Sequence, residues 1–363
     1  MLQEALGRVD ERLRNASVAT RAFLRDLPTV STRMWILLAG LALLGVLSLL
    51  AYRIMIDVKP RMSRTITDRS HQFEIEALRV RLMDHVRVLG STIGERHLGR
   101  QQALQAAADY IRETWTRYGL MVSEERFEVG GRSVVNLIVE RRGSVRPEEI
   151  VVVGAHYDSA PGTPGANDNG TGVALLLEMA RALKDAPVPR TIRYAAFVNE
   201  EPPYYFSENM GSRVHARGAR SRGENIVAMI SLETIGYYST ASGTQRYPFP
   251  FGFFYPHTGN FLTVVGNLRS RALVVDFLRH FMAATDFPVE GAATFEWIPG
   301  VNWSDHWSFW TEGYPAVMLT DTAPFRYPHY HGTHDLPEQV AAPDFARASH
   351  GIVAAVRALA TAP

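Results

Sequence analysis

Five short clusters of acidic residues and histidines follow apolar runs between Val151 and Asp335. They read AHYDS at 155–159, GANDNGTG at 165–172, VNEE at 198–201, SLETIGYY at 231–238 and HYHGTHD at 329–335. An open α/β sheet collects its ligand groups where its strands end. The pattern therefore predicts an α/β domain with a metal-assisted hydrolase site at the strand ends.

Short β-branched runs alternate with helical patterns from about Phe73 onward. We expect strands over 134–139, 150–154, 191–198, 226–232 and 316–319, and helices over 101–118, 171–183, 268–282 and 344–359. Gly119 supplies the stop signal for the first of these helices. This alternation predicts a mostly parallel mixed sheet sandwiched by helices.

Composition narrows the chemistry that the chain can carry out. With 38 basic and 37 acidic residues, its charge does not indicate a nucleic-acid partner. The absence of cysteine excludes disulfides, thiolate ligands and a cysteine nucleophile. Any metal must therefore be held by His, Asp and Glu, a ligand set that suits catalytic zinc, with manganese or cobalt as substitutes.

An uncharged apolar run of 19 residues, MWILLAGLALLGVLSLLAY, covers 34–52. This is close to the ~20 residues that a helix needs to cross a ~30 Å hydrocarbon core, so we expect one transmembrane helix. A cleaved signal peptide is the alternative, but it would have a short basic start, whereas 33 residues precede this run.

Basic residues flank the apolar run on both sides, so the positive-inside rule does not decide its orientation. A short tail before an uncleaved first helix most simply leaves the N-terminus in the cytoplasm. We therefore expect a cytoplasmic tail over 1–33, a polar juxtamembrane stalk over 53–74, and a catalytic domain over 75–363 on the periplasmic or extracellular side.

His156, Asp158 and Asp168 are the first candidate site residues. A histidine at a strand end can bind a metal through one ring nitrogen while a carboxylate orients the other, although a hydrogen-bonded structural histidine is the alternative. Asp168 lies in a Gly- and Asn-rich turn before an apolar helix, where Asn167, Asp168 or Asn169 could instead cap the helix. Its position beside His156 in a parallel sheet favours a ligand.

Glu200 and Glu201 directly follow the apolar strand RYAAFV. Two adjacent carboxylates repel at a site with little solvent unless one binds a cation and the other shares a proton. Hydrolysis uses this division, because one glutamate can ligate the metal while its neighbour moves a proton. A solvated surface pair is the alternative.

Two further positions carry less local information. Glu233 ends the run IVAMIS and is either a ligand or a lone half-buried carboxylate. Periodicity does not choose a ligand among His329, His331 and His334. The aromatic stretch YPFPFGFFYPH at 247–257 either lines a hydrophobic substrate pocket or packs against the core.

Together with SDHWSFW at 304–310 and GYPAVML at 313–319, the clusters closely resemble the M28 family of zinc peptidases over about residues 75–360. The resemblance implies a phosphorylase/aminopeptidase-like α/β fold and a co-catalytic aminopeptidase that hydrolyses peptides. It also implies two zinc ions per chain. One would be held by Asp168, Glu201 and His331, and the other by His156, Asp168 and Glu233, so that Asp168 bridges them.

The same resemblance implies roles for three other side chains. Glu200 matches the general base, Asp158 matches the partner that orients His156, and Tyr330 matches the hydroxyl that steadies the tetrahedral oxyanion. The sequence departs from the family pattern at Glu233, where many members have Asp, and in the Pro- and Tyr-rich stretch at 202–212.

Two other functions stay open. Glutaminyl cyclases resemble the same fold but use a single zinc and aminoacyl transfer, and Asp305 would then matter most. A catalytically silent, receptor-like domain on the peptidase scaffold is the second alternative. The complete ligand set and Tyr330, where the cyclases tend to place Trp, favour a peptidase. Family frequency favours an aminopeptidase over a carboxypeptidase, and the oligomeric state is not predicted.

Overall fold

The computed structural model describes residues 30–61 and 68–362. The chain divides into two compact units, Met1–Arg53 and Ile54–Pro363. Helix α2 (Val30–Met55) contains the predicted apolar run, and 22 of its residues, Met34–Met55, are long and apolar enough to cross a membrane. By length and composition this segment also fits a signal sequence. Most of the tail predicted for 1–33 lies outside the described residues.

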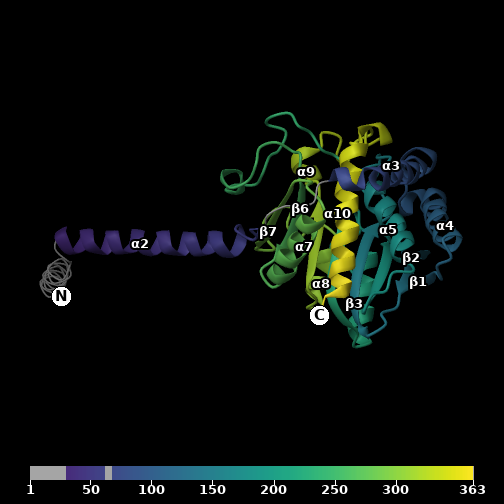
Figure 1. Ribbon diagram of the computed structural model, residues 1–363, viewed down its shortest axis with the longest axis horizontal. Helices are drawn as coiled ribbons and strands as arrows, with labels where there is room; N and C mark the ends of the chain where they lie inside the picture. Colours follow the sequence, from purple (N-terminus) through teal and green to yellow (C-terminus); the bar gives the residue numbers. More distant parts are fainter. Residues whose placement is uncertain (1–29, 62–67, 363) are drawn as a thin grey trace, which may run out of the picture. The chain divides into compact units, whose positions relative to one another are not determined.

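The second unit, drawn in Figure 1, is built on one eight-stranded sheet. The order of its strands is β1-β2-β4-β3-β5-β8-β6-β7. Its strands are β1 Ser123–Val129, β2 Arg132–Arg141, β3 Arg146–His156, β4 Arg190–Phe197, β5 Asn225–Glu233, β6 Leu262–Asn267, β7 Val289–Thr294 and β8 Ala316–Thr320. The four central strands, β4, β3, β5 and β8, run parallel, and antiparallel pairs join β2 and β6 to them. The predicted mostly parallel mixed sheet is confirmed.

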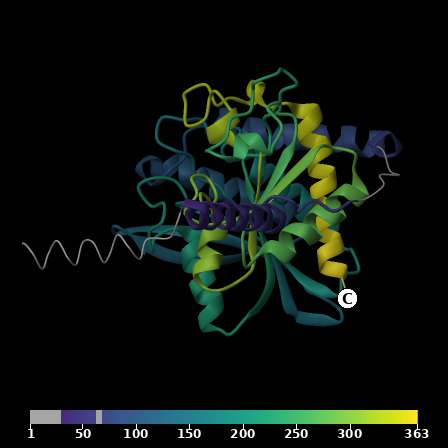
Figure 2. The same ribbon diagram turned by 90° about the vertical axis from the view of Figure 1, so that its left-hand side faces the viewer.

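Helices cover both faces of this sheet, as Figure 2 shows from a second direction. The larger core lies under α3 (Gln72–Arg87), α4 (Gln101–Arg117), α5 (Gly170–Leu183), α7 (Arg271–Ala284) and α10 (Ala342–Thr361). The smaller core lies under α6 (Gly211–Ser221) and α8 (His306–Thr311). The short helix α9 (Ala323–Arg326) follows β8.

The predicted elements are all present, with ends that differ by a few residues. Strands β3 and β5 are apolar along most of their length because both of their faces are buried. Helix α4 ends at Arg117, and Gly119 follows it with φ +77°. The sequence reasoning missed the edge strand β1, the pair β6 and β7, and the helices α3, α6, α8 and α9.

The segment predicted as a stalk over 53–74 packs on the domain where it is described. Val58 is buried in the larger core, and the Lys59 Nζ lies 2.8 Å from the Glu290 Oε1. The Asp68 carboxylate accepts hydrogen bonds from the Thr285 hydroxyl at 2.6 Å and the Arg347 Nε at 2.7 Å. These parts of the segment therefore belong to the folded unit instead of projecting from it.

Candidate metal centre

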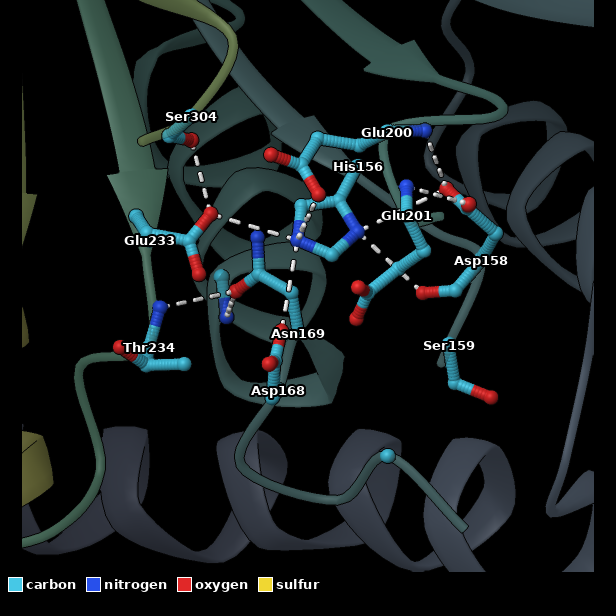
Figure 3. A network of polar contacts seen from close by, with 12 residues as sticks. His156, Asp158, Ser159, Asp168, Asn169, Glu200, Glu201, Glu233, Thr234 and Ser304 are labelled. Atoms are coloured by element: carbon cyan, nitrogen blue, oxygen red, sulfur yellow. Dashed lines mark hydrogen bonds and ion pairs between the residues drawn. The ribbon is translucent and has the colours of Figure 1, made fainter. Parts of the chain in front are cut away.

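The end of β3 and the turn before α5 bring His156 and Asp168 together (Figure 3). His156 is the last residue of β3, and Asp168 lies in the turn before α5; both are buried. The cap of α5 is Asn169, whose Oδ1 accepts a hydrogen bond from the Gly172 N–H at 3.1 Å. Asp168 does not cap the helix. Its Oδ1 lies 3.4 Å from the His156 Nε2.

Glu200 and Glu201 follow β4 and are only 6% and 3% exposed, so they are not a solvated surface pair. Their backbone N–H groups donate to the two carboxylate oxygens of Asp158, each at 3.1 Å. The Asp158 Oδ1 also lies 3.5 Å from the His156 Nδ1, and the Asp158 carbonyl oxygen is closer, at 3.2 Å. Asp158 therefore fixes the two glutamates as well as contacting His156, which the sequence reasoning did not predict.

Glu233 is the last residue of β5 and is buried. Its Oε2 lies 3.3 Å from the His156 Nε2 and accepts a hydrogen bond from the Ser304 hydroxyl at 2.7 Å. The Ser304 hydroxyl lies 2.9 Å from that of Ser231, which is also on β5. Ser304 thus orients the carboxylate, a contact that the motif SDHWSFW alone does not reveal.

His331 is the histidine of its cluster that meets the other candidates. Its Nε2 lies 3.2 Å from the Asp168 Oδ2 and 3.3 Å from the Glu201 Oε2. Its ring stacks on Tyr330, with centroids 3.9 Å apart. The rings of His329 and His334 contact each other instead, at 5.9 Å.

These side chains form two triads that share Asp168: His156, Asp168 and Glu233, and Asp168, Glu201 and His331. Within each triad the ligand atoms lie within 4.8 Å of one another. A third grouping joins His156 to Glu200 and Glu201.

The spacing of these atoms suits a metal ion. Tetrahedral ligands about 2.0–2.1 Å from zinc are about 3.4 Å apart, and the contacts between histidine and carboxylate atoms in the two triads are 3.2–3.4 Å. The His156 Nε2, Asp168 Oδ1 and Glu201 Oε1 are buried without a hydrogen-bond partner. Since buried polar atoms are rarely left unpaired, these three fit as ligands.

The charges of the site also call for a cation. Four buried carboxylates, Asp168, Glu200, Glu201 and Glu233, face two imidazoles. Burial and neighbouring carboxylates raise the pKa of Glu200 well above its ordinary value and that of Glu201 to about 7. Burial opposes a charge on His156, but Glu200 and Glu233 outweigh it and raise its pKa well above the ordinary value. The cluster therefore favours a positive charge among its carboxylates.

Asp335 and Arg96 support the site, and sequence reasoning assigned neither of them a role. The Asp335 carboxylate accepts hydrogen bonds from the Asn167 N–H at 2.8 Å and the Asp168 N–H at 3.0 Å, which fixes the turn that carries Asp168. Arg96 is fully buried and donates to the backbone carbonyls of Tyr157, Pro164 and Gly165. Its guanidinium thereby ties the segment after β3 to the turn before α5.

A largely apolar cavity lies beside the triads, with Glu233 and Tyr330 in its wall. It contains about 810 Å³ of empty space, part of which is open to solvent. Aromatic side chains line much of it, among them Tyr247, Phe251, Tyr255, Phe261, Trp303 and Phe325. Four residues of the aromatic stretch at 247–257, Tyr247, Pro248, Phe251 and Tyr255, therefore line this cavity.

Comparisons with known proteins agree with this fold. A sequence profile described as peptidase family M28 matches residues 136–356. The uncharacterized protein YfbL of Escherichia coli (strain K12) is 35% identical over 278 residues, which cover 74% of this chain and 84% of that protein.

Two solved structures share the fold at low sequence identity. BSAP, a zinc aminopeptidase from Bacillus subtilis, matches with a TM-score of 0.59 and 16% identity, covering 78% of this chain and 95% of that chain. The glutaminyl cyclase of Fimbriiglobus ruber matches with a TM-score of 0.57 and 19% identity, covering 77% and 94%. These likenesses describe the fold.

Proposed function

The chain belongs to peptidase family M28, and we propose that it is a zinc-dependent aminopeptidase held at a membrane by its N-terminal helix. The observation that carries the proposal is the pair of triads that share Asp168, whose members are all buried except His331. One zinc ion would be held by Asp168, Glu201 and His331, and a second by His156, Asp168 and Glu233.

Glu200 is the proposed general base. When bound, zinc would supply polarisation of the scissile carbonyl and activation of a water molecule. The Glu200 carboxylate is buried, with its Oε2 3.8 Å from the His156 Nε2, and burial raises its pKa. It accepts the proton of the attacking water and returns it to the amine that leaves. Asp158 holds the Glu200 backbone in place for this transfer.

Tyr330 is the proposed hydrogen-bond donor to the oxyanion. Burial and the nearby carboxylates, Asp168 first among them, raise the pKa of its phenol, so the hydroxyl keeps its proton. The stacking of its ring on His331 holds it in the wall of the cavity. A donor fixed in advance at this position stabilises negative charge as it develops.

The cavity beside Glu233 and Tyr330 is proposed to receive the side chain of the N-terminal residue. Its walls are aromatic and aliphatic, so burial of a large apolar side chain there is favourable. We therefore expect leucine, methionine or phenylalanine at the N-terminus of the substrate to be preferred over alanine or acidic residues.

One experiment tests this function. The full chain, purified in detergent, is assayed on chromogenic amides with different N-terminal residues, with and without a chelator, and on N-acetylated versions of the same amides. We expect chelator-sensitive hydrolysis that needs the free amine and favours large apolar residues. A response that is flat across residues and insensitive to the chelator would overturn the proposal.

A glutaminyl cyclase is the second candidate, favoured by the shared fold and by Asp305. This carboxyl is fully buried near the site, and burial raises its pKa to about 7, which suits proton transfer. Incubation with a peptide that begins with glutamine distinguishes the two activities by mass, because cyclisation releases ammonia whereas hydrolysis releases the free amino acid.

A further inference from the structure

The loop between β5 and β6 exposes large aromatic side chains. Phe249 is 86% exposed, Phe253 is 79% exposed and Phe254 is 47% exposed. The rings of Phe249 and Phe253 contact each other at 6.0 Å. In Figure 1 this green segment extends outward from the body of the domain. A cluster of exposed apolar side chains marks a surface that binds another apolar surface, such as that of a protein or a membrane.

The two ends of this loop are held together by contacts at its base. The Tyr247 hydroxyl donates to the Pro256 carbonyl at 2.5 Å, and the Tyr247 and Tyr255 rings stack at 5.7 Å. Phe251 points the other way, since it is only 8% exposed and lines the cavity. The loop therefore presents Tyr247, Phe251 and Tyr255 to the cavity, and its more exposed phenylalanines to the outside.

The base of the loop and the segment after α2 meet on the edge strand β7. The Tyr255 hydroxyl donates to the Gly291 carbonyl at 2.7 Å, and the Lys59 Nζ lies 2.8 Å from the adjacent Glu290 carboxylate. Val58 packs against Gly291, since a Cβ at Gly291 would lie 3.2 Å from the Val58 Cγ2. Glu290 and Gly291 of β7 thus contact both the base of the loop and the segment that follows α2.

The few residues between α2 and Val58 keep this part of β7 close to the end of the apolar helix. Helix α2 ends at Met55, and Val58 is already buried in the core. Three residues span at most about 11 Å. Where Met34–Met55 crosses a bilayer, Val58 and the loop base on β7 must therefore stay close to the surface of that bilayer.

We propose that Phe249, Phe253 and Phe254 form a second membrane contact, seated in the interfacial layer of the bilayer that the N-terminal helix crosses. Aromatic rings favour this layer, and the helix supplies the membrane within reach. The contact would hold the aromatic wall of the cavity at the membrane surface. The inference rests on the proposed anchor and not on the proposed chemistry.

The test uses the absence of cysteine, which allows single labels to be placed cleanly. An environment-sensitive fluorophore is attached at Phe253→Cys, at Leu43→Cys within the apolar helix, and at Met121→Cys, an equally exposed position on another part of the domain. Each full-length variant is reconstituted into phosphatidylcholine vesicles with or without lipids that carry a quencher at the acyl-chain end nearest the headgroup.

We expect lipid quenching at 253 and 43 and none at 121. Replacing Phe249 and Phe254 by Ser should remove most of the quenching at 253, which shows that the loop and not the dye seeks the membrane. Quenching at 43 with a water-exposed label at 253 would overturn the contact while leaving the anchor intact. A water-exposed label at both positions would overturn the anchor and the contact with it. Hydrolysis of a soluble amide by the same variants reports separately on the proposed enzymatic function.

Discussion

Three residues at or beside the proposed ligands adopt left-handed backbone conformations that side chains other than glycine rarely accept. Asn199 has a φ of 61°, Thr234 of 43° and His331 of 53°. Such a conformation costs about 1–3 kcal/mol and persists where the surrounding contacts fix it. Here it turns the chain immediately before Glu200, immediately after Glu233 and at the proposed ligand His331. The strained positions thus lie where the backbone sets the direction of the site's side chains.

Replacing Glu200 by Gln tests the proposed base. The amide keeps the shape of the side chain but cannot take up the proton, so kcat should fall by about 10²–10⁴-fold. Zinc content should stay unchanged, because Glu200 belongs to neither proposed triad. Glu208→Gln, an exposed glutamate paired with Arg213 and Arg217, is the matched control. Activity of Glu200→Gln near that of the wild type would show that the base is another group.

Replacing Ser304 by Ala tests how Glu233 is positioned. Loss of the 2.7 Å hydrogen bond frees the carboxylate, and the affinity of the His156, Asp168 and Glu233 triad for zinc should fall by about 10-fold. Competition with a chelating dye measures this affinity. Ser308→Ala is the control, because Ser308 is a buried serine four residues further along the chain, in α8, and its hydroxyl contacts that of Ser212 instead. Equal affinities in both variants would rule out the positioning role.

At the scale of helices and strands, an element could be predicted from sequence where most of its residues are buried. The central strands β3 and β5 could be predicted because burial on both faces demands continuous apolar runs. Strand β1, SEERFEV, is a largely exposed edge strand with no such run. Helix α6, GSRVHARGARS, is rich in arginine and glycine, and its buried positions hold only glycine, serine, histidine and alanine. Neither element has the continuous run of large apolar residues from which the central strands were predicted.

The close approach of α5 to β5 depends on a glycine in the first turn of α5. A Cβ at Gly172 would lie 2.3 Å from the Asn169 Oδ1 and 2.7 Å from the Leu232 carbonyl oxygen. Gly172→Ala should therefore destabilise the fold by about 1–3 kcal/mol, as overpacking does, and also weaken zinc binding by disturbing the cap beside Asp168.

Thermal unfolding with zinc analysis measures both effects. Gly218→Ala is the control, since the nearest atom to a Cβ in α6 is the flexible Arg222 guanidinium at 3.0 Å. There we expect no loss of stability, or a gain of up to about 1 kcal/mol. A Gly172→Ala protein as stable as this control would show that the helix has room to move.

Helix α8 gives the fold a pH dependence of its own. Burial lowers the pKa of His306 to about 4. An unfolded histidine titrates near pH ~6.5. Between these values only the unfolded chain takes up the proton, so stability should fall as pH drops from about 6.5 to about 4, by up to about 1.4 kcal/mol per pH unit.

Denaturant unfolding of the chelated protein measures this slope without a contribution from metal release. The His306→Gln variant keeps a donor for the Val301 carbonyl, which lies 2.8 Å from the His306 Nε2, and should show a shallower slope. An unchanged slope in the variant would assign the pH dependence to other groups.

At the scale of the whole molecule, the site closes only when distant segments meet. Local sequence gives three histidines in the last cluster and no basis for choosing among them, and family resemblance pointed to His331. In the fold, the Asp335 carboxylate holds the turn of Asp168, and the His331 Nε2 reaches Asp168 and Glu201. The strand-end candidates His156 and Glu233 could be predicted from apolar runs. The contacts of His331 and Asp335 with the rest of the site could not, because they depend on the path of the chain after β8.

The shared carboxylate of Asp168 is the centre of the account, and the anomalous scattering of zinc tests it most directly. Data collected on either side of the zinc absorption edge from crystals of the zinc-loaded protein locate each bound ion. We predict two peaks about 3.5–4 Å apart, one within bonding distance of His156 and Glu233, the other of Glu201 and His331, and both beside Asp168. A single peak, or peaks that leave Asp168 unbound, would contradict the proposed two-zinc centre.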